Sequence, residues 1–133
     1  MQGSEEQKIL FEAFFDNYFD SMQETIKYEV SEEQTLLILR LERKVSSRGR
    51  EIKMQNHFII EKDLFGLHLK KIIVHQGGAG GGHYVVYFEC DNEWYMYDDL
   101  VGITYYGNFE KVSRDGDEDD SVSRNCTTLF YER

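Results

Sequence analysis

The chain has 133 residues, a length typical of one domain with a sizeable hydrophobic core. Apolar residues make up 41% of the sequence and aromatic residues 14%, so a packed globular fold is expected rather than disorder. The net charge of −10, from 15 basic and 25 acidic residues, argues against nucleic acid as a direct partner, because phosphate contacts need a basic surface.

The first half of the chain predicts one helix followed by strands. Apolar and aromatic side chains recur at three- and four-residue steps over residues 11–22, which places them on one broad face of a helix. Residues 26–30 alternate apolar and polar side chains, as a half-buried strand does, and residues 36–41 are a strongly apolar strand candidate. Residues 46–50 are typical of a turn, and residues 52–60 contain a further, broadly alternating set.

The second half of the chain predicts a sheet. Strand patterns cover residues 67–74, 83–90, 93–97 and 127–131, and the chain has no proline to interrupt them. One helix and then about seven strands, without helices between them, favour an α+β fold with a mostly antiparallel sheet. We see no linker and no repeat, so residues 1–133 are expected to form a single domain.

Three further patterns restrict the class of protein. No apolar run approaches the ~20 residues of a membrane helix, and the acidic amino terminus MQGSEEQK is unlike a signal peptide. Cys90 and Cys126 form no CxxC motif, so we expect two reduced thiols rather than a disulfide, in a cytoplasmic or nuclear protein. The acidic run at residues 115–120 is typical of a solvated loop, with a docking site for a basic partner as the alternative.

A glycine-rich segment stands directly before a histidine. Residues 77–82 hold five of the chain's 11 glycines and lead into His83. Phosphate binding is excluded, because the segment lacks GxGxxG spacing, no Gly-Lys-Ser/Thr follows, and the next element is a strand. The glycines then indicate positive φ angles, close approach of another backbone or a loop that moves, with a merely flexible connector as the alternative.

The predicted hairpin after this loop brings His83 beside an aspartate. If Asp91 and Asn92 form a two-residue turn, Asp98 lies on the face of His83, one position diagonal to it and within side-chain reach. A three-residue turn would present Asp99 instead. The carboxylate would hold one imidazole nitrogen and leave the other free as a base, although such a pair can also be structural.

The segment VHQGGAGGGHYVVYFECDNEWYMYDD, residues 74–99, resembles the histidine box of the ubiquitin-specific proteases, which are papain-like cysteine proteases that remove ubiquitin. Upstream, TLLILRLERKVSSRGREIKMQNHFII is similar to a strand and lysine-bearing turn of that family, and downstream CTTLFYER is similar to its closing strand. LFEAFFDNYFD is similar to the helix that precedes this half. The resemblance covers residues 9–133 and implies the palm half of the protease domain.

The resemblance implies a role for each matched residue. His83 would be the general base, Asp98 would orient it, and Asp99 would be a near neighbour that assists. His75 matches a histidine ahead of the loop and is implied to be structural. The residues implied to line the narrow channel for the glycine-ended tail of ubiquitin are Gly81, Gly82 and Tyr84.

The departures from the family's pattern are equally informative. The nucleophilic cysteine of the family lies in an Asn-x-Gly-Asn-Thr-Cys-like motif, and the sequence contains no such motif, nor the oxyanion-hole asparagine that accompanies it. Cys90 lies at the far end of the strand from His83, some ~23 Å away at ~3.3 Å per residue, and Cys126 lies in the closing strand. The family's zinc-binding CxxC pairs are missing as well, so we expect no metal and no other cofactor.

Three hypotheses about function follow. The first is a binding module for ubiquitin, a ubiquitin-like protein or another partner, inactive alone because it lacks the cysteine half. The second is the base-bearing half of an active thiol deubiquitinase whose nucleophile comes from another chain or an upstream segment. The third is a structural subunit of a larger assembly. The missing half would leave apolar surface exposed, which a complementing chain or a homodimer would cover.

Overall fold

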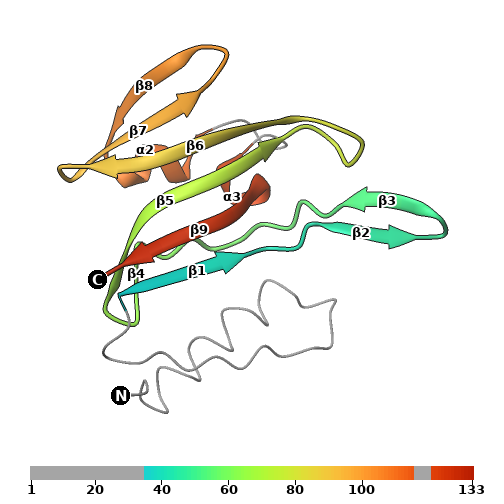
Figure 1. Cartoon of the computed structure of the whole chain (residues 1–133), viewed down its shortest axis with the longest axis horizontal. Helices are drawn as coiled ribbons and strands as arrows, with labels where there is room; N and C mark the ends of the chain where they lie inside the picture. The colour runs from blue at the N-terminus through green and yellow to red at the C-terminus, as the bar shows by residue number, and fades with distance from the viewer. Residues whose placement is uncertain (1–34, 116–120) are drawn as a thin grey trace.

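The computed structural model of the chain describes residues 35–115 and 121–133, and the structural statements below concern these residues. The helix predicted at residues 11–22 and the strand predicted at residues 26–30 lie outside the described residues, as does most of the acidic run. The described part consists of a large sheet with a few short helices (Figure 1).

The main sheet has seven strands, and every pair in it is antiparallel. The strands follow one another in the order β1, β9, β5, β6, β7 and β8, and the short β4 pairs with β5. Their bounds are β1 Leu36–Arg40, β4 Asp63–Leu64, β5 Leu67–Gln76, β6 His83–Cys90, β7 Glu93–Asp98, β8 Gly102–Gly107 and β9 Cys126–Glu132. The last strand, β9, therefore lies between β1 and β5 (Figure 1).

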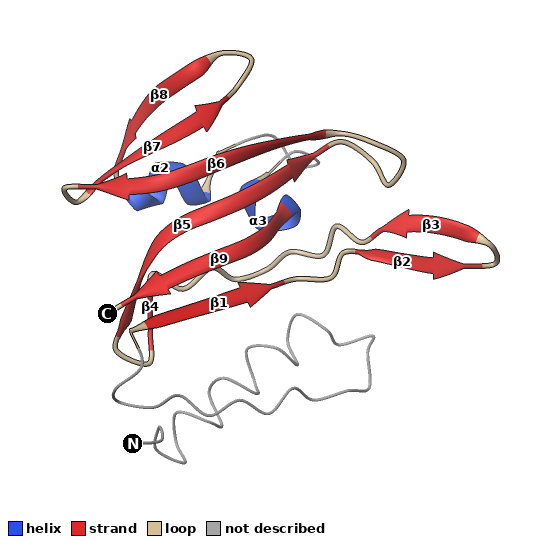
Figure 2. Ribbon diagram, in the orientation of Figure 1, coloured by secondary structure: helices blue, strands red, loops and turns tan. Residues whose placement is uncertain are grey.

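A second, two-stranded sheet forms an arm that projects from the main one. Its strands are β2 (Lys44–Ser47) and β3 (Arg50–Lys53), joined in an antiparallel hairpin (Figure 2). Arg48 and Gly49 between them have φ angles of 52° and 75°, the conformation that a two-residue hairpin turn requires. The turn predicted at residues 46–50 is the tip of this arm.

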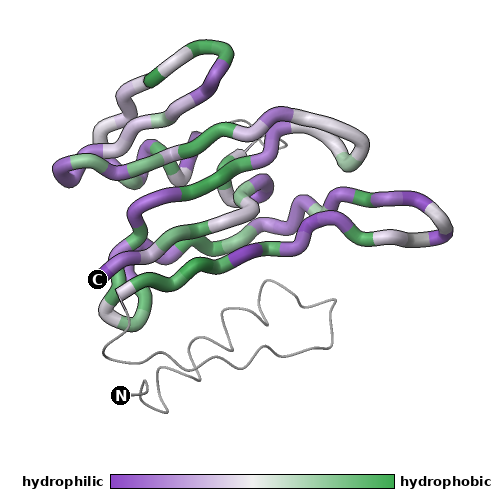
Figure 3. Tube along the Cα trace, in the orientation of Figure 1, coloured by the Kyte–Doolittle hydropathy of each residue, from purple (hydrophilic) through white to green (hydrophobic). Residues whose placement is uncertain are grey.

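One face of the main sheet is buried and carries the core. In β1 the side chains of Leu37 and Leu39 are buried whereas those of Leu36 and Ile38 are exposed, because successive residues of a strand point to opposite faces. Hydrophobic positions run along β1, β5 and β6 (Figure 3). The other face of the sheet carries much of the exposed apolar surface.

Two short helices contribute to the buried side. α2 (Phe109–Ser113) and α3 (Val122–Asn125) each supply a buried valine, Val112 and Val122, to the same hydrophobic cluster as the inward side chains of the sheet. None of the helices in the described part is long and apolar enough to cross a membrane. The mostly antiparallel sheet with few helices confirms that part of the fold prediction.

Five strand predictions are confirmed, since residues 36–41, 67–74, 83–90, 93–97 and 127–131 correspond to β1, β5, β6, β7 and β9. The alternating pattern over residues 52–60 continues as a strand only to Lys53, and residues 54–60 have no strand pairing. Their backbone bonds outside any strand ladder instead, with the Met54 N–H donating to the carbonyl oxygen of Arg43 and the Phe58 N–H to that of Ser123 in α3. Phe58 is nevertheless fully buried, which accounts for the apolar pattern.

Arg43 is a buried arginine that joins the arm to the core. The residue is 3% exposed, and its guanidinium donates to the carbonyl oxygens of Cys126 at 2.6 Å and Ser123 at 3.1 Å. It also donates to the carbonyl oxygens of Met54 at 2.9 Å and Asn56 at 3.1 Å. Charge-assisted hydrogen bonds of this kind offset the cost of burying the cation, and they fix the chain on both sides of the arm.

Candidate active site

The β6–β7 hairpin sets the register of the site. Asp91 and Asn92 have φ angles of 52° and 65°, and positive φ at both positions defines a two-residue turn that suits a twisted hairpin. Cys90 therefore pairs with Glu93, and the ladder continues from there toward the start of β6. This confirms the predicted register, which brings the start of β6 beside the end of β7.

His83 and Asp98 form the hydrogen-bonded pair that this register predicts. His83 Nε2 lies 2.7 Å from Asp98 Oδ1, and the two side chains are 29% and 13% exposed. The same carboxylate oxygen accepts the backbone N–H of Leu100 at 2.9 Å. The bond from Leu100 and then that from His83 hold the pKa of Asp98 below its ordinary value, which favours the ionised carboxylate. Within residues 35–115 and 121–133, no residue hydrogen-bonds the other ring nitrogen, His83 Nδ1.

Asp99 supplies a second carboxylate beside the pair. Its Oδ1 lies 3.4 Å from His83 Nε2, and 65% of its side chain is exposed, so solvent screens its charge more than that of Asp98. Within the described residues, these three side chains are also the one group of His, Cys, Asp and Glu close enough to hold a metal ion. Exposed carboxylates often gather without a metal, and a hydrogen-bonded acid–base pair already accounts for this arrangement.

The glycine loop before His83 is packed so closely at Gly82 that a side chain there would not fit. Gly82 has a φ of +134°, and a Cβ there would lie 2.4 Å from both His75 Nε2 and the carbonyl oxygen of Gln76. His75 Nε2 donates to the carbonyl oxygen of Gly81 at 2.9 Å, so the ring lies directly against the loop. Positive φ and close backbone approach, two of the expected reasons for the glycines, are therefore both present.

Lys53, at the end of the arm, hydrogen-bonds the residues at the start of this loop. Its Nζ donates to the carbonyl oxygens of His75 at 2.9 Å and Gly77 at 2.7 Å, and to Asn125 Oδ1 at 2.7 Å. His75 is 4% exposed, and burial, followed by the nearby Lys53 cation, lowers its pKa below the ordinary value. The ring is therefore neutral at physiological pH and supports the loop.

Gly81, Gly82 and Tyr84, which the resemblance implies to line the channel for the ubiquitin tail, do not share one face of β6. Gly81 and Gly82 are exposed beside His83. Tyr84 follows His83 on β6, so its side chain points to the opposite face of the strand. It is 56% exposed, and its ring centroid lies 4.9 Å from that of His75. Their part in binding a peptide tail stays a prediction.

Both cysteines are free thiols, as expected, and neither approaches His83. Cys126 is fully buried, with Arg43 donating to its Sγ at 3.7 Å, and burial raises the pKa of its thiol. Cys90 is exposed but ends β6, at the opposite end of the strand from His83. The site thus holds an imidazole paired with a carboxylate, and neither cysteine belongs to this group of side chains.

The first residue of the acidic run, Asp115, lies in a loop and is half-buried there by hydrogen bonds to two tyrosines. Asp115 Oδ2 accepts the hydroxyl groups of Tyr87 at 2.5 Å and Tyr106 at 2.7 Å. Burial and this carboxylate raise the pKa of Tyr106 to about 12 and also raise that of Tyr87. Asp115 therefore lies in a loop as predicted, but its carboxylate is paired rather than solvated, and residues 116–120 lie outside the described residues. Nothing in a run of acidic residues signals which one is paired.

In this sheet, Asp98 holds the imidazole of His83 by Nε2, and no described residue bonds Nδ1. Hydrolases that use a side-chain nucleophile hold their general base in a similar way. The sequence matches the model of the ubiquitin carboxyl-terminal hydrolase family over residues 5–131. The chain belongs to this family.

Solved structures of the SAGA DUB module have a similar fold. The Ubp8–Sgf11–Sgf73–Sus1 module matches with a TM-score of 0.59 at 19% identity, over 74% of this chain and 24% of the matched chain. A yeast module with a mutant Sgf73 gives the same values. The module bound to monoubiquitin matches with a TM-score of 0.58 at 18% identity, over 74% and 23% of the two chains. The present chain thus spans about a quarter of these structures' chains, and at this identity the likeness shows the fold alone. No curated protein matches the sequence.

Proposed function

We propose that this chain provides the base-bearing half of a thiol hydrolase site for substrates that carry ubiquitin or a ubiquitin-like protein. Taken alone, it binds such a protein without cleaving it. The observation that carries the proposal is the His83–Asp98 hydrogen bond through Nε2, with no partner for Nδ1 among the described residues. A module that only binds, or a purely structural subunit, has no chemical need for a base held in this way.

In the proposed reaction, a thiol transfers its proton to His83 Nδ1, and the thiolate attacks the carbonyl carbon at the end of ubiquitin. Asp98 orients the ring through Nε2 and stabilises the imidazolium that forms. Asp99 adds a second negative charge, weakened by its exposure. The imidazolium then gives its proton to the leaving amine, and the acyl enzyme is hydrolysed by water.

The nucleophile in this proposal comes from another chain or from a segment that precedes this half. Cys126 is buried behind Arg43, and Cys90 lies at the other end of β6. The similar solved structures are multi-subunit modules, and one of them holds monoubiquitin. Those assemblies support the expectation that ubiquitin and a complementing chain are partners of this protein.

Titration of the chain with labelled ubiquitin, with and without its last two glycines, tests the binding part of the proposal. Standard interfaces bury about 1,600 Å², and contacts below about 1,200 Å² tend to be weak, so half of a binding surface should give micromolar or poorer affinity. The truncated ubiquitin should bind more weakly. Equal affinity for both forms would reject recognition of the tail.

Two glycine variants make this test specific to the predicted channel. A Cβ at Gly81 or at Gly78 meets nothing within 4 Å, and neither residue has a positive φ, so both positions have space for the first carbon of a side chain. Gly81 adjoins the His83 end of the loop, and Gly81→Val should weaken ubiquitin binding while Gly78→Val leaves it unchanged. Equal effects would show that the tail does not pass Gly81.

Hydrolysis assays test the chemical part. The isolated chain should not cleave a ubiquitin–amide substrate, because neither thiol reaches His83. Cleavage that is lost in Cys90→Ala or Cys126→Ala would show that the nucleophile belongs to this chain after all.

A further inference from the structure

The strand β8 lies at one end of the main sheet, with β7 on one side and no described strand on the other (Figure 1). Among the backbone hydrogen bonds that described residues form outside the strand ladders and helices, none reaches residues 102–107. The N–H and C=O groups along the outer side of β8 therefore have no backbone partner in the described part of the chain. An edge of this kind can accept an added strand.

The sequence of β8 leaves this edge open to pairing. GITYYG carries neither a charge nor a proline, two features that commonly prevent pairing at the edge of a sheet. Ile103, Thr104 and Tyr105 are residue types that favour strands. The register with β7 is regular from Gly102 to Tyr105 and shifts at Tyr106, so a bulge ends the regular edge there. An added segment would pair over these four residues.

On the face of the sheet away from the core, β8 presents apolar side chains to solvent. Ile103 and Tyr105 are 66% and 60% exposed. The ring centroid of Tyr105 lies 5.4 Å from that of Tyr95 in β7, and the Tyr95 ring stacks on Phe88 of β6 at 5.6 Å. This aromatic row across three strands ends at Tyr105, and a strand added to β8 would continue it.

The surroundings of β8 are acidic. Residues 83–110 contain no Lys or Arg, and their acidic residues are Glu89, Asp91, Glu93, Asp98, Asp99 and Glu110. Glu93 and Glu110 are both exposed and lie at the Gly107 end of β8, since Glu93 Oε1 accepts the Tyr105 hydroxyl at 2.9 Å and Glu110 is in the first turn of α2. Pairing of two copies of the chain through β8 would bring acidic groups against acidic groups, whereas a cationic segment complements them.

We propose that the edge of β8 binds an extended segment of a partner protein, which joins the sheet as a further strand antiparallel to β8. The segment carries β-branched side chains that lie beside Ile103 and Tyr105. Its amino-terminal end carries Lys or Arg residues, which face Glu93 and Glu110. Antiparallel pairing matches every other pair of the sheet and is slightly the more stable kind. Main-chain hydrogen bonds supply affinity, and the side chains supply selectivity.

This surface is separate from the candidate active site. Glu93 begins β7 and Asp98 ends it, so the proposed cations lie ~16 Å along the strand from Asp98, at ~3.3 Å per residue. Residues 102–107 belong neither to the His83–Asp98 pair nor to the predicted channel for the ubiquitin tail. Since the proposal requires neither ubiquitin nor a thiol, it stands or falls separately from the proposed function.

Fluorescence polarisation with the labelled peptide Lys-Lys-Thr-Ile-Thr-Ile-Thr tests the role of the charges. The double variant Glu93→Lys, Glu110→Lys should bind this peptide roughly tenfold more weakly or worse, because opposed charges become like charges. The matched control Glu51→Lys, Glu61→Lys changes the net charge equally at exposed positions outside β7, β8 and α2, and it should bind as the wild type does.

Two N-methylated forms of the same peptide test the backbone pairing with the wild-type protein, so this test does not depend on the folding of a variant. One form carries methyl groups on the amide nitrogens of its Thr residues, and the other carries them on those of its Ile residues. Alternate N–H groups of a strand point to opposite edges, so only one of the two sets can donate to β8. One form should lose binding and the other should keep it.

Several results would overturn the proposal. Equal binding of the two N-methylated peptides would exclude strand pairing, and equal losses in the two double variants would exclude recognition by Glu93 and Glu110. Absence of binding at millimolar peptide would exclude a cationic strand as the occupant. A dimer in light scattering that Ile103→Lys abolishes would assign the edge to a second copy of the chain instead.

Discussion

Gly82 shows how strongly the site depends on a single residue. Its φ of +134° and the closeness of His75 Nε2 leave no space for a side chain. We expect Gly82→Ala to lower the free energy of unfolding by about 1–3 kcal/mol, because backbone strain and steric overlap act together. Urea denaturation measures this change. Gly80→Ala is the control, since a Cβ there meets nothing within 4 Å, and an equal loss in both variants would contradict the close packing at Gly82.

The neutral state of His75 gives the protein a pH dependence. Burial and the Lys53 cation, with a smaller effect of Lys44, lower the pKa of His75 from 6.5, so the unfolded chain takes up this proton at a higher pH than the folded one. The stability that His75 contributes is therefore present above pH 6.5 and decreases as the pH falls below it. Urea midpoints of the wild type and His75→Gln, compared from about pH 8 to about pH 5, should converge on acidification. Parallel curves would show that His75 remains unprotonated or contributes nothing.

Among the elements, the β6–β7 hairpin determines the geometry of the candidate site. Its two turn residues both have positive φ, which Asn tolerates and a β-branched residue does not. Asn92→Val should therefore destabilise the protein by about 1–2 kcal/mol, whereas Asn92→Gly should leave the stability equal or slightly higher. Thermal unfolding of the two variants measures the difference. Equal midpoints would mean that another contact fixes the register.

The same hairpin explains which parts of the structure could be predicted from the sequence. Alternation along β6 and the short turn fix the position of Asp98 relative to His83, and these are local properties of the chain. β8 escapes prediction because Ile103, Thr104 and Tyr105 are all exposed, so it shows no buried alternation. The helices α2 and α3 have five and four residues, too few to show a helical period.

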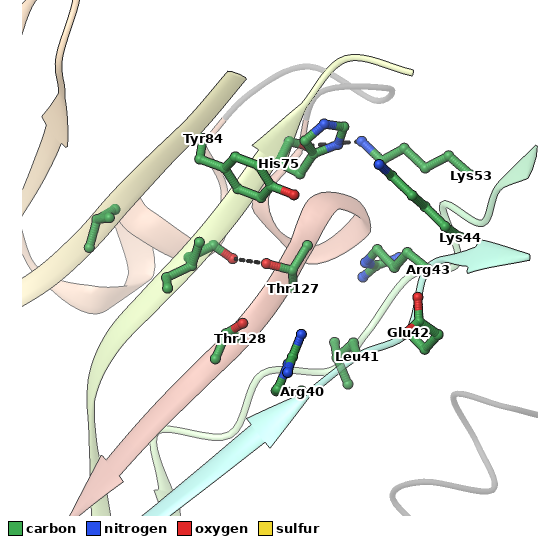
Figure 4. Close-up of a pocket in the computed structure, with 12 residues that line it drawn as sticks. Arg40, Leu41, Glu42, Arg43, Lys44, Lys53, His75, Tyr84, Thr127 and Thr128 are labelled. Carbon is green, nitrogen blue, oxygen red and sulfur yellow. Dashed lines mark hydrogen bonds between the residues drawn. The ribbon is translucent and has the colours of Figure 1, made fainter. Parts of the chain in front are cut away.

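Contacts between distant segments account for the remaining differences. Lys53 reaches His75 and Asn125, and Arg43 reaches Cys126, through pairings that no local pattern encodes. The segment over residues 54–60 has the apolar spacing of a strand, but its backbone bonds to Arg43 and to Ser123 of α3 rather than to a neighbouring strand, and these partners are distant in sequence. The groove beside Arg40, Lys53 and Tyr84 (Figure 4) is likewise invisible in the sequence, because its lining residues come from six strands and one connection.

For the molecule as a whole, Arg43 connects the arm, β9 and α3. Removing its guanidinium leaves the carbonyl groups of Cys126 and Ser123 without this buried donor. We expect Arg43→Met to lower the free energy of unfolding by about 3 kcal/mol or more, because the guanidinium's bonds to the carbonyl groups of Cys126, Ser123, Met54 and Asn56 are lost together, and a hydrogen bond to a charged group contributes about 1.5–3 kcal/mol. Arg40→Met, at an exposed position of β1, should change it little. Similar urea midpoints for the two variants would show that water replaces the buried contacts at no cost.

The short turn at Asp91 and Asn92 also has a consequence for the order of folding. It allows His83 and Asp98, 15 residues apart in the chain, to meet as soon as one hairpin closes, and isolated hairpins form in about 1–10 μs. The pairing of β1 with β9, by contrast, joins the two ends of the described chain and has to wait for a much larger closure. We therefore expect the His83–Asp98 pair to assemble early, and β1 to join the sheet only when the last strand, β9, has entered it.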